Sequence, residues 1–291
     1  MRVTEGVGYQ NLLRDLARIE ERMQTAQTQV STGKKISNPS ENPSIAVDII
    51  RLNGEKIEFE QYARSLAFAK SKLEVADAVL DNVQKMVERV RTLGQLSFGD
   101  PASAAAYITE VSGLRDQIIA AANTTHGGRS LFGGSVTTTS PYVKGADSTV
   151  TYLGNDQNMP LQVSRTLTLQ TQVPGSEVFS GAVDVFAVIS GLMDAIQSRE
   201  RPNIDAQLKK LEQLSEVLST GRSKIGSYLN LAANAESELA STSLAREKEL
   251  TQEQAADLAK AITELTMSQN ALQATLAVGA KMSQLTILDY L

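Results

Sequence analysis

Few residues of this 291-residue chain could take part in catalysis or bind a metal. The only histidine, His126, stands beside Gly127 and Gly128, with no nucleophile or carboxylate organised around it as general acid–base catalysis or metal binding would need. We interpret His126 as a turn residue. The chain has no cysteine, which excludes disulfides, thiolate metal sites and thiol catalysis. We therefore predict that the chain is not an enzyme and uses no cofactor or metal.

Glycine pairs at 127–128 and 133–134 could suggest a phosphate-binding loop, but the Walker spacing that ends in Gly-Lys-Ser/Thr is missing. The Gly-Lys pair at 33–34 lacks both the upstream glycine and a preceding strand. We interpret these glycines as positions where the backbone turns at positive φ. Acidic residues such as Glu20 and Glu21 interleave with basic ones, as is typical of solvated helix faces.

The composition narrows the possible partners. The net charge is -5, and no cluster of basic residues could follow a phosphate backbone, so we do not expect a nucleic-acid partner. No stretch approaches the roughly 18 apolar residues of a membrane span, and the N-terminus shows no apolar signal-peptide core. If the protein leaves the cell, we expect a route that reads an uncleaved N-terminus.

The two ends of the chain carry apolar stripes with the same heptad spacing, and these are the strongest signal in the sequence. The N-terminal stripe consists of Leu12, Leu16, Ile19, Met23, Ala26 and Val30. The C-terminal stripe consists of Leu258, Ile262, Leu265, Leu272 and Leu276, with Gln269 at one position, and we add Leu285 and Leu288 to it. Such a stripe is stable only when another helix covers it. We predict that the termini pair with each other, with copies of the chain, or both, and that these large apolar residues form an assembly interface.

Between the ends, long helices are expected. Asn42 and Pro43 read as an N-cap and first-turn pair, after which apolar residues recur every seven positions as far as Val87. This pattern predicts a helix over about 43–98, followed by an antiparallel neighbour that ends near residue 123. Helix is expected again over about 182–198 and from Pro202 onward, with a weakly held or hinge segment over 230–257.

A glycine-punctuated stretch over about 131–181 has a different character. Runs over 149–153, 161–163 and 167–173 alternate with period two, which predicts half-exposed strands. We predict a β-rich outer insertion that is dispensable for the helical body, because the helical stripes should pack through residues outside it.

The predicted fold is mainly α: a long antiparallel helical bundle or rod with terminal coiled-coil arms and a small β-rich insertion. The expected parts are an N-terminal arm and junction loop over 1–42 pairing with a C-terminal arm over 250–291, a helical body over 43–130 and 182–249, and the insertion over 131–181.

Two segments resemble known sequences. Residues 31–36 read Ser-Thr-Gly-Lys-Lys-Ile, with Asn38-Pro-Ser and Pro43 following, and this resembles the N-terminal motif of the bacterial flagellin superfamily. Residues 269–274 and the final Ile-Leu-Asp-Tyr-Leu over 287–291 resemble the C-terminal arm of the same superfamily. The Met-Arg-Val start, the Leu-Asp-Tyr-Leu end and Leu-Phe-Gly-Gly over 131–134 favour the members that join hook to filament. One departure is Glu41-Asn42, where the family usually has two acidic residues.

The resemblance implies an extracellular structural protein of the flagellum, located at the hook–filament junction and exported through the flagellum's own secretion channel without a cleavable signal peptide. Implied partners are the first hook-associated protein, flagellin, copies of the chain itself and a cytoplasmic export chaperone that covers the C-terminal arm. Two alternatives remain open: a flagellin filament subunit and, in a different class, a cytoplasmic coiled-coil adaptor.

Overall fold

The computed structural model describes residues 2–145 and 149–288, and the side chains of residues 7–100, 102–145 and 149–281. The chain divides into two compact units: unit 1 comprises residues 1–58 and 242–291, and unit 2 comprises residues 59–241. The boundary therefore falls inside the two longest helices, whereas the sequence led us to expect it at about 42 and 250. The predicted mainly-α fold with long helices and a small β-rich insertion is confirmed.

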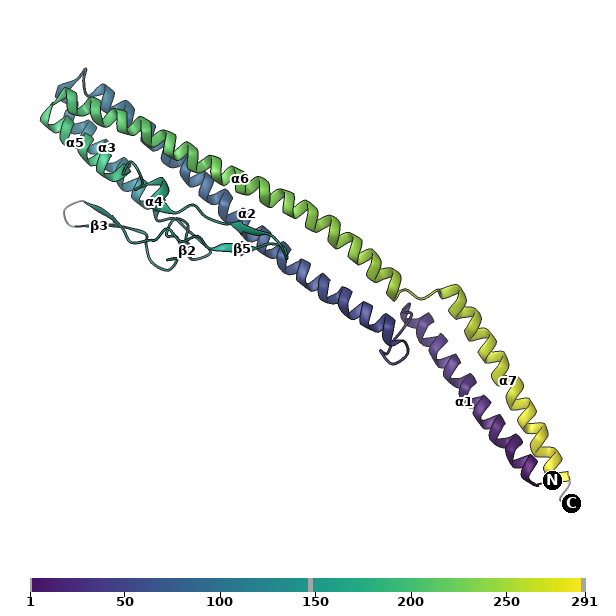
Figure 1. Cartoon of the computed structure of the whole chain (residues 1–291). Coiled ribbons are helices and arrows are strands. Elements are labelled where there is room, and N and C mark those ends of the chain that lie inside the picture. Colours follow the sequence, from purple (N-terminus) through teal and green to yellow (C-terminus); the bar gives the residue numbers. More distant parts are fainter. Residues whose placement is uncertain (1, 146–148, 289–291) are drawn as a thin grey trace. The chain divides into compact units, whose positions relative to one another are not determined.

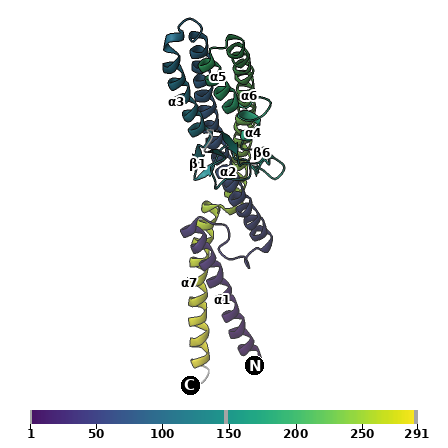
Figure 2. The same cartoon turned by 90° about the vertical axis from the view of Figure 1, so that its left-hand side faces the viewer.

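Unit 2 is built on a group of antiparallel helices, and Figure 2 shows them gathered side by side. The helices are α2 (Pro43–Leu96) and α6 (Arg201–Gln254), which both continue into unit 1, with α3 (Ala104–Ala122) and α5 (Val185–Ser198). A 3-10 turn, η1 (Pro101–Ser103), precedes α3. The helices predicted at 43–98, at about 104–123 and at 182–198 are thus confirmed within a few residues.

Polar contacts fix the antiparallel register of α2 and α6 in unit 2. Arg222 of α6 binds Asp77 and Asp81 of α2, with its Nη1 atom 2.8 Å from the Asp81 Oδ1 atom. One end of the pairing is marked by Lys70 and Glu236, whose charged atoms lie 3.2 Å apart. As the numbers rise along α2 they fall along α6, as antiparallel neighbours require.

The core of unit 2 comes from the heptad positions of α2. Leu66, Leu73, Leu80 and Val87 are all buried, and they belong to one cluster with the buried leucines of α6. Regular spacing of seven keeps these side chains on one face of the helix, so one continuous stripe is removed from water. No residue of unit 1 belongs to this cluster among the described side chains.

Three small antiparallel strand pairs follow α3. They are β1 (Thr125–His126) with β2 (Arg129–Ser130), β3 (Tyr142–Lys144) with β4 (Val150–Tyr152), and β5 (Pro160–Gln162) with β6 (Thr168–Gln170). The strands predicted from alternation are confirmed as β4, β5 and β6. A single-turn helix, α4 (Gly175–Val178), closes the insertion.

The turn interpretation of the first glycine pair is confirmed. Gly127 and Gly128 connect β1 to β2 with φ values of 57° and 75°, which side chains with a Cβ atom rarely adopt. His126 lies at the end of β1, and its ring centroid is 5.8 Å from that of Phe68. The structure therefore gives His126 an aromatic neighbour at a hairpin turn.

The insertion contributes to the core of unit 2, so the expectation that the helices pack only through residues outside it is wrong. Phe132, Tyr142 and Phe179 are all buried, and the Phe132 and Phe179 rings meet edge to face with centroids 5.2 Å apart. The Tyr142 ring also lies 5.3 Å from that of Phe186 in α5. Burial raises the pKa of the Tyr142 hydroxyl well above its usual range, because the phenolate would be desolvated, and the nearby acidic groups of Tyr152, Asp184 and Asp156 raise it further. These aromatics were missed because they lie in short strands, turns and loops without periodic spacing.

Unit 1 contains α1 (Arg2–Thr32) and α7 (Leu258–Leu288), with the start of α2 and the end of α6. Figure 1 shows α1 and α7 side by side, and the two helices contact each other along their length. The stretch over 230–257 is helical as far as Gln254, and the helix breaks only at residues 255–257.

Candidate assembly interface

The turn between α1 and α2 is held by backbone hydrogen bonds to the break in the helix before α7. Gly33 has a φ of 67° and ends α1. The carbonyl oxygen of Gly33 accepts a hydrogen bond from the Ala256 N–H at 2.9 Å, and the Lys35 N–H donates to the Gln254 carbonyl oxygen at 2.7 Å. These bonds form a short antiparallel bridge between Lys34 and Ala255. The Ser-Thr-Gly-Lys-Lys segment therefore joins the bases of the two terminal helices.

The second half of the motif starts α2. The Glu41 carboxylate accepts hydrogen bonds from the Ser37 and Asn38 backbone N–H groups at 3.1 and 3.2 Å, which closes the turn. The Asn42 Oδ1 atom accepts from the Ile45 N–H at 3.3 Å, and Pro43 is the first residue of α2. The predicted N-cap is confirmed, and asparagine serves there as an aspartate would.

The N-terminal stripe lies on the less exposed face of α1. Ala26 is buried, and Leu12, Leu16, Ile19, Met23 and Val30 are half-buried. Leu13, which lies off the stripe, is exposed, and so is Tyr9, which continues the heptad spacing at the N-terminal end of the stripe. The face of α1 with the heptad spacing is therefore the one that contacts α7.

The C-terminal stripe divides between two faces of α7. Leu265 and Leu272 are half-buried and share the covered face with small residues, of which Ala261 and Ser268 are the most buried. A Cβ atom added to Gly279 would lie 3.1 Å from the Leu12 Cδ2 atom, so the glycine permits close approach of α1. The face covered by α1 is thus centred on Ala261, Ser268 and Gly279.

The remaining large residues of the predicted C-terminal stripe are exposed on the flank of the covered face. Leu258, Ile262 and Leu276 are 47%, 52% and 56% exposed, and Met267 and Val278 are also exposed. The small residues Ala261, Ser268 and Gly279 let α1 approach α7 closely. A contact centred on the large residues of the stripe would hold the two helices further apart. Leu285 and Leu288 belong to α7, but the structure does not describe their side chains.

Charged pairs connect α2 and α6 within unit 1. The Arg51 Nη1 atom lies 3.1 Å from the Glu55 carboxylate, and the Arg246 Nε atom lies 3.3 Å from the other oxygen of Glu55. The hydrogen bonds that the Arg51 guanidinium donates to Glu55 and to Asp48 raise its pKa, the bond to Glu55 more strongly. Because exposed pairs of this kind contribute little to stability, unit 1 gains mainly register and solubility from them.

The described part of unit 1 offers little for catalysis. A cleft of about 550 Å³ lies where the turn meets α7, lined by Lys35, Asp257, Lys260 and Glu264 among others. The Asp257 carboxylate caps α7 by accepting from the Lys260 N–H at 3.0 Å, so its role there is structural. Among the described residues, no three acidic or histidine side chains are arranged to hold a metal ion, and no helix is long and apolar enough to cross a bilayer.

Two buried cations in unit 2 were missed by the sequence reading. Arg115 occupies a buried position of α3 between Val111 and Ile118, and Lys72 is buried on α2 beside Leu73. The step of seven from Val111 to Ile118 leaves Arg115 as the only charged residue in the stripe. That interruption was the available signal.

Comparison with known proteins finds similarity to the same group of flagellar proteins that the sequence motifs resemble. Residues 5–137 match the family described as the bacterial flagellin N-terminal helical region. The chain is 26% identical to flagellar hook-associated protein 3 of Escherichia coli K12, over 99% of this chain and 98% of that protein. It is 28% identical to the protein of the same name in Salmonella typhimurium LT2, over 62% of this chain and 57% of that protein.

Solved structures share the fold. A candidate flagellar hook-associated protein of Vibrio parahaemolyticus superposes with a TM-score of 0.69 at 20% identity, covering 74% of this chain and all of that one. Flagellar hook-associated protein 3 of Legionella pneumophila gives a TM-score of 0.63 at 13% identity, covering 70% of this chain and 99% of that one.

Proposed function

We propose that this chain is a flagellin-like structural protein of the bacterial flagellum and that it joins the hook to the flagellin filament. In this proposal it is an extracellular, non-enzymatic subunit at the hook–filament junction, exported through the flagellum's own channel. Its similarity to flagellar hook-associated protein 3 over 99% of its length supports this role over that of a filament subunit.

The observation that carries the proposal is the exposed apolar face of α7. Ile262 and Leu276 lie two heptads apart, Leu258 lies one turn before Ile262, and all three are about half exposed on the flank of the face that α1 covers. Apolar residues at this spacing are stable only when a further helix packs on them. We infer that helices of neighbouring subunits cover this face in the assembled flagellum.

The proposed partners are copies of the chain within the junction, the first hook-associated protein on the hook side and flagellin on the filament side. An export chaperone would cover α7 in the cytoplasm, because an exposed apolar stripe promotes premature association. The half-buried residues Leu12, Leu16, Ile19, Met23, Val30, Leu265 and Leu272 would hold α1 against α7, and we keep them in the proposed assembly interface.

Substitution of the exposed stripe tests the proposal. Ile262→Asp and Leu276→Asp place a charge where a neighbouring helix is expected, and burial of an unpaired charge costs several kcal/mol. Cells that carry either variant should export the chain but release flagellin into the medium instead of retaining filaments. Leu153→Asp is the matched control, because Leu153 is 54% exposed in unit 2.

Normal filaments with both α7 variants would show that this face is not an assembly interface. The two rival functions predict other results. A filament subunit should extend long filaments from seeds as a purified protein. A cytoplasmic adaptor should form a defined oligomer and should never reach the medium.

A further inference from the structure

Arg115 is a buried cation in the core-facing stripe of α3. Its relative exposure is 4%, and its neighbours in the stripe are Val111, Ile118 and Ala122. A guanidinium does not lose its proton in proteins, so burial removes a permanent charge from water. Such burial is unfavourable unless an anion and hydrogen bonds compensate it.

The hydrogen bonds of Arg115 within the described residues do not supply that anion. The Nη1 atom donates to the Ser190 Oγ atom at 3.1 Å, and Ser190 is neutral. The buried Nε atom makes no hydrogen bond within the described part of the chain. It lies 3.9 Å from the Asp116 Oδ1 atom, which is too far for a hydrogen bond, and that oxygen accepts from the Lys144 Nζ atom at 2.8 Å.

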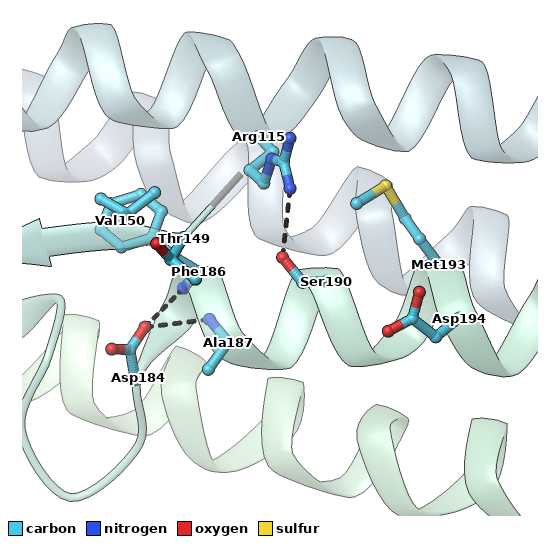
Figure 3. A pocket seen from close by; sticks show the side chains of 9 residues that line it. All are labelled: Arg115, Thr149, Val150, Asp184, Phe186, Ala187, Ser190, Met193 and Asp194. Atoms are coloured by element: carbon cyan, nitrogen blue, oxygen red, sulfur yellow. Dashed lines mark hydrogen bonds between the residues drawn. The ribbon is translucent and has the colours of Figure 1, made fainter. Parts of the chain in front are cut away.

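The Arg115 side chain lines a pocket of about 510 Å³ between α3 and α5 in unit 2. Figure 3 shows the guanidinium directed toward Ser190, with Met193 to one side and Val150 and Phe186 to the other. Small-molecule sites in proteins have volumes of roughly 300–1,000 Å³, so this pocket is large enough for one. The site therefore combines an incompletely paired cation, a hydroxyl group and an apolar wall.

The charges around the pocket restrict the ligand. Asp184 and Asp194 also line it, so its ionisable groups are one cation and two carboxylates. The Asp184 Oδ1 atom caps α5 by accepting from the Phe186 and Ala187 N–H groups at 2.8 and 3.0 Å. A polyanion such as phosphate would be repelled by both aspartates. A single carboxylate matches the guanidinium fork and adds only one negative charge.

We propose that the pocket between α3 and α5 binds one carboxylate group, held by the Arg115 guanidinium and the Ser190 hydroxyl group. The substituent on the carboxylate contacts Val150, Phe186 and Met193. The carboxylate belongs either to a free organic acid or to a glutamate side chain of a peptide, since both present the same chemistry.

Nuclear magnetic resonance of the full chain with ¹⁵N-labelled arginine tests the proposal. Sodium propionate and sodium benzoate are titrated at constant ionic strength, with sodium chloride and sodium phosphate as comparison salts. The Nε–Hε signal of Arg115, identified by its loss in Arg115→Met, should shift saturably with the carboxylates only. Arg89→Met is the matched control, because Arg89 pairs with Glu110 on the surface of the same unit, and it should leave the shift unchanged.

Two further variants separate binding from folding. Ser190→Ala should weaken carboxylate binding several-fold while the thermal midpoint stays near that of the wild type. Arg115→Lys keeps the charge but loses the fork, and it should weaken binding at least tenfold.

A second titration identifies the source of the carboxylate. An acetylated and amidated peptide with one glutamate is compared with its glutamine counterpart. If the glutamate peptide saturates the shift and the glutamine peptide does not, the ligand is a protein. If the free acids saturate the shift and the glutamate peptide does not, the ligand is an organic acid. Absence of a saturable shift with any carboxylate, or an equal shift with chloride or phosphate, would overturn the proposal.

Discussion

Unit 1 and unit 2 bury their apolar residues to very different extents. In unit 2, heptad leucines of α2 and α6 and the aromatic residues of the insertion form one continuous core. In unit 1, Leu52 and Leu250 are the only large apolar side chains that are buried among the described residues, and twelve large apolar side chains are exposed. Unit 2 therefore has the burial that independent stability requires, whereas unit 1 presents apolar surface that further helices can cover.

Removal of the insertion should have the largest effect. Replacing residues 131–181 with a short Gly/Ser linker deletes Phe132, Tyr142 and Phe179 from the core of unit 2. Loss of one buried phenylalanine costs about 3–5 kcal/mol, so loss of several aromatics approaches the whole stability of a domain. Circular dichroism at helical wavelengths should show no cooperative transition.

Leu153→Ala, at an exposed position of the same insertion, should leave that transition unchanged. A cooperative transition that survived the deletion would mean that the insertion is an appendage, as the sequence alone led us to expect.

The second largest effect should come from a Leu→Ala substitution, which should lower the free energy of unfolding much more in unit 2 than in unit 1. Leu73→Ala in the core of unit 2 should lower the free energy of unfolding by about 2–5 kcal/mol. Leu272→Ala on the half-buried face of α7 should lower it by about 1 kcal/mol or less, because surrounding water already covers much of that side chain. Denaturant titration of both purified variants measures the difference. Equal losses would contradict the contrast between the units.

Lys72 gives unit 2 a pH dependence that unit 1 should lack. Burial and then the charge of Arg129 lower the pKa of Lys72 to about 8, and its Nζ atom donates to the Gln172 Oε1 atom at 2.8 Å. Below about pH 8, Lys72 is charged in the folded state, and the whole cost of burying that charge lowers the free energy of unfolding. Between about 8 and 10.5 the unfolded chain binds more protons, so the free energy of unfolding should rise with pH, by roughly 3 kcal/mol over the whole window.

Unfolding from pH 7.5 to 9.5 measures this rise before the tyrosines titrate. Lys72→Met should remove it, and Lys56→Met, which alters an exposed pair with Glu247 in unit 1, should retain it. A rise of the same size in the Lys72 variant would assign the effect to other groups.

Sequence patterns predicted the features that depend on neighbouring residues in the chain. They failed for features that depend on which distant segment packs against a helix. Asn42 and Pro43 started α2 as expected, because capping depends on neighbouring residues. The stripe on α7 was located, but its apolar spacing could not tell which residues α1 would cover. Arg115 was missed for a related reason: a pattern of apolar residues does not show that a charged residue can occupy one of its positions.

The aromatic core of the insertion depends on contacts between segments that are distant in the sequence. The Tyr142 ring lies 5.6 and 5.3 Å from the rings of Phe179 and Phe186, measured between centroids, although these residues are 37 and 44 positions further along the chain. No spacing in the sequence signals such a meeting.

Hydrogen exchange of the free chain tests the central claim most directly. We predict that the amides of residues 7–30 and 258–281 exchange rapidly in dilute monomer, because helices with little burial are marginal in water, while residues 66–93 are protected. Both terminal segments should become protected when the chain is bound at the tips of isolated hooks. Strong protection of both segments in dilute monomer, equal to that of residues 66–93, would contradict the claim that unit 1 is completed by its partners.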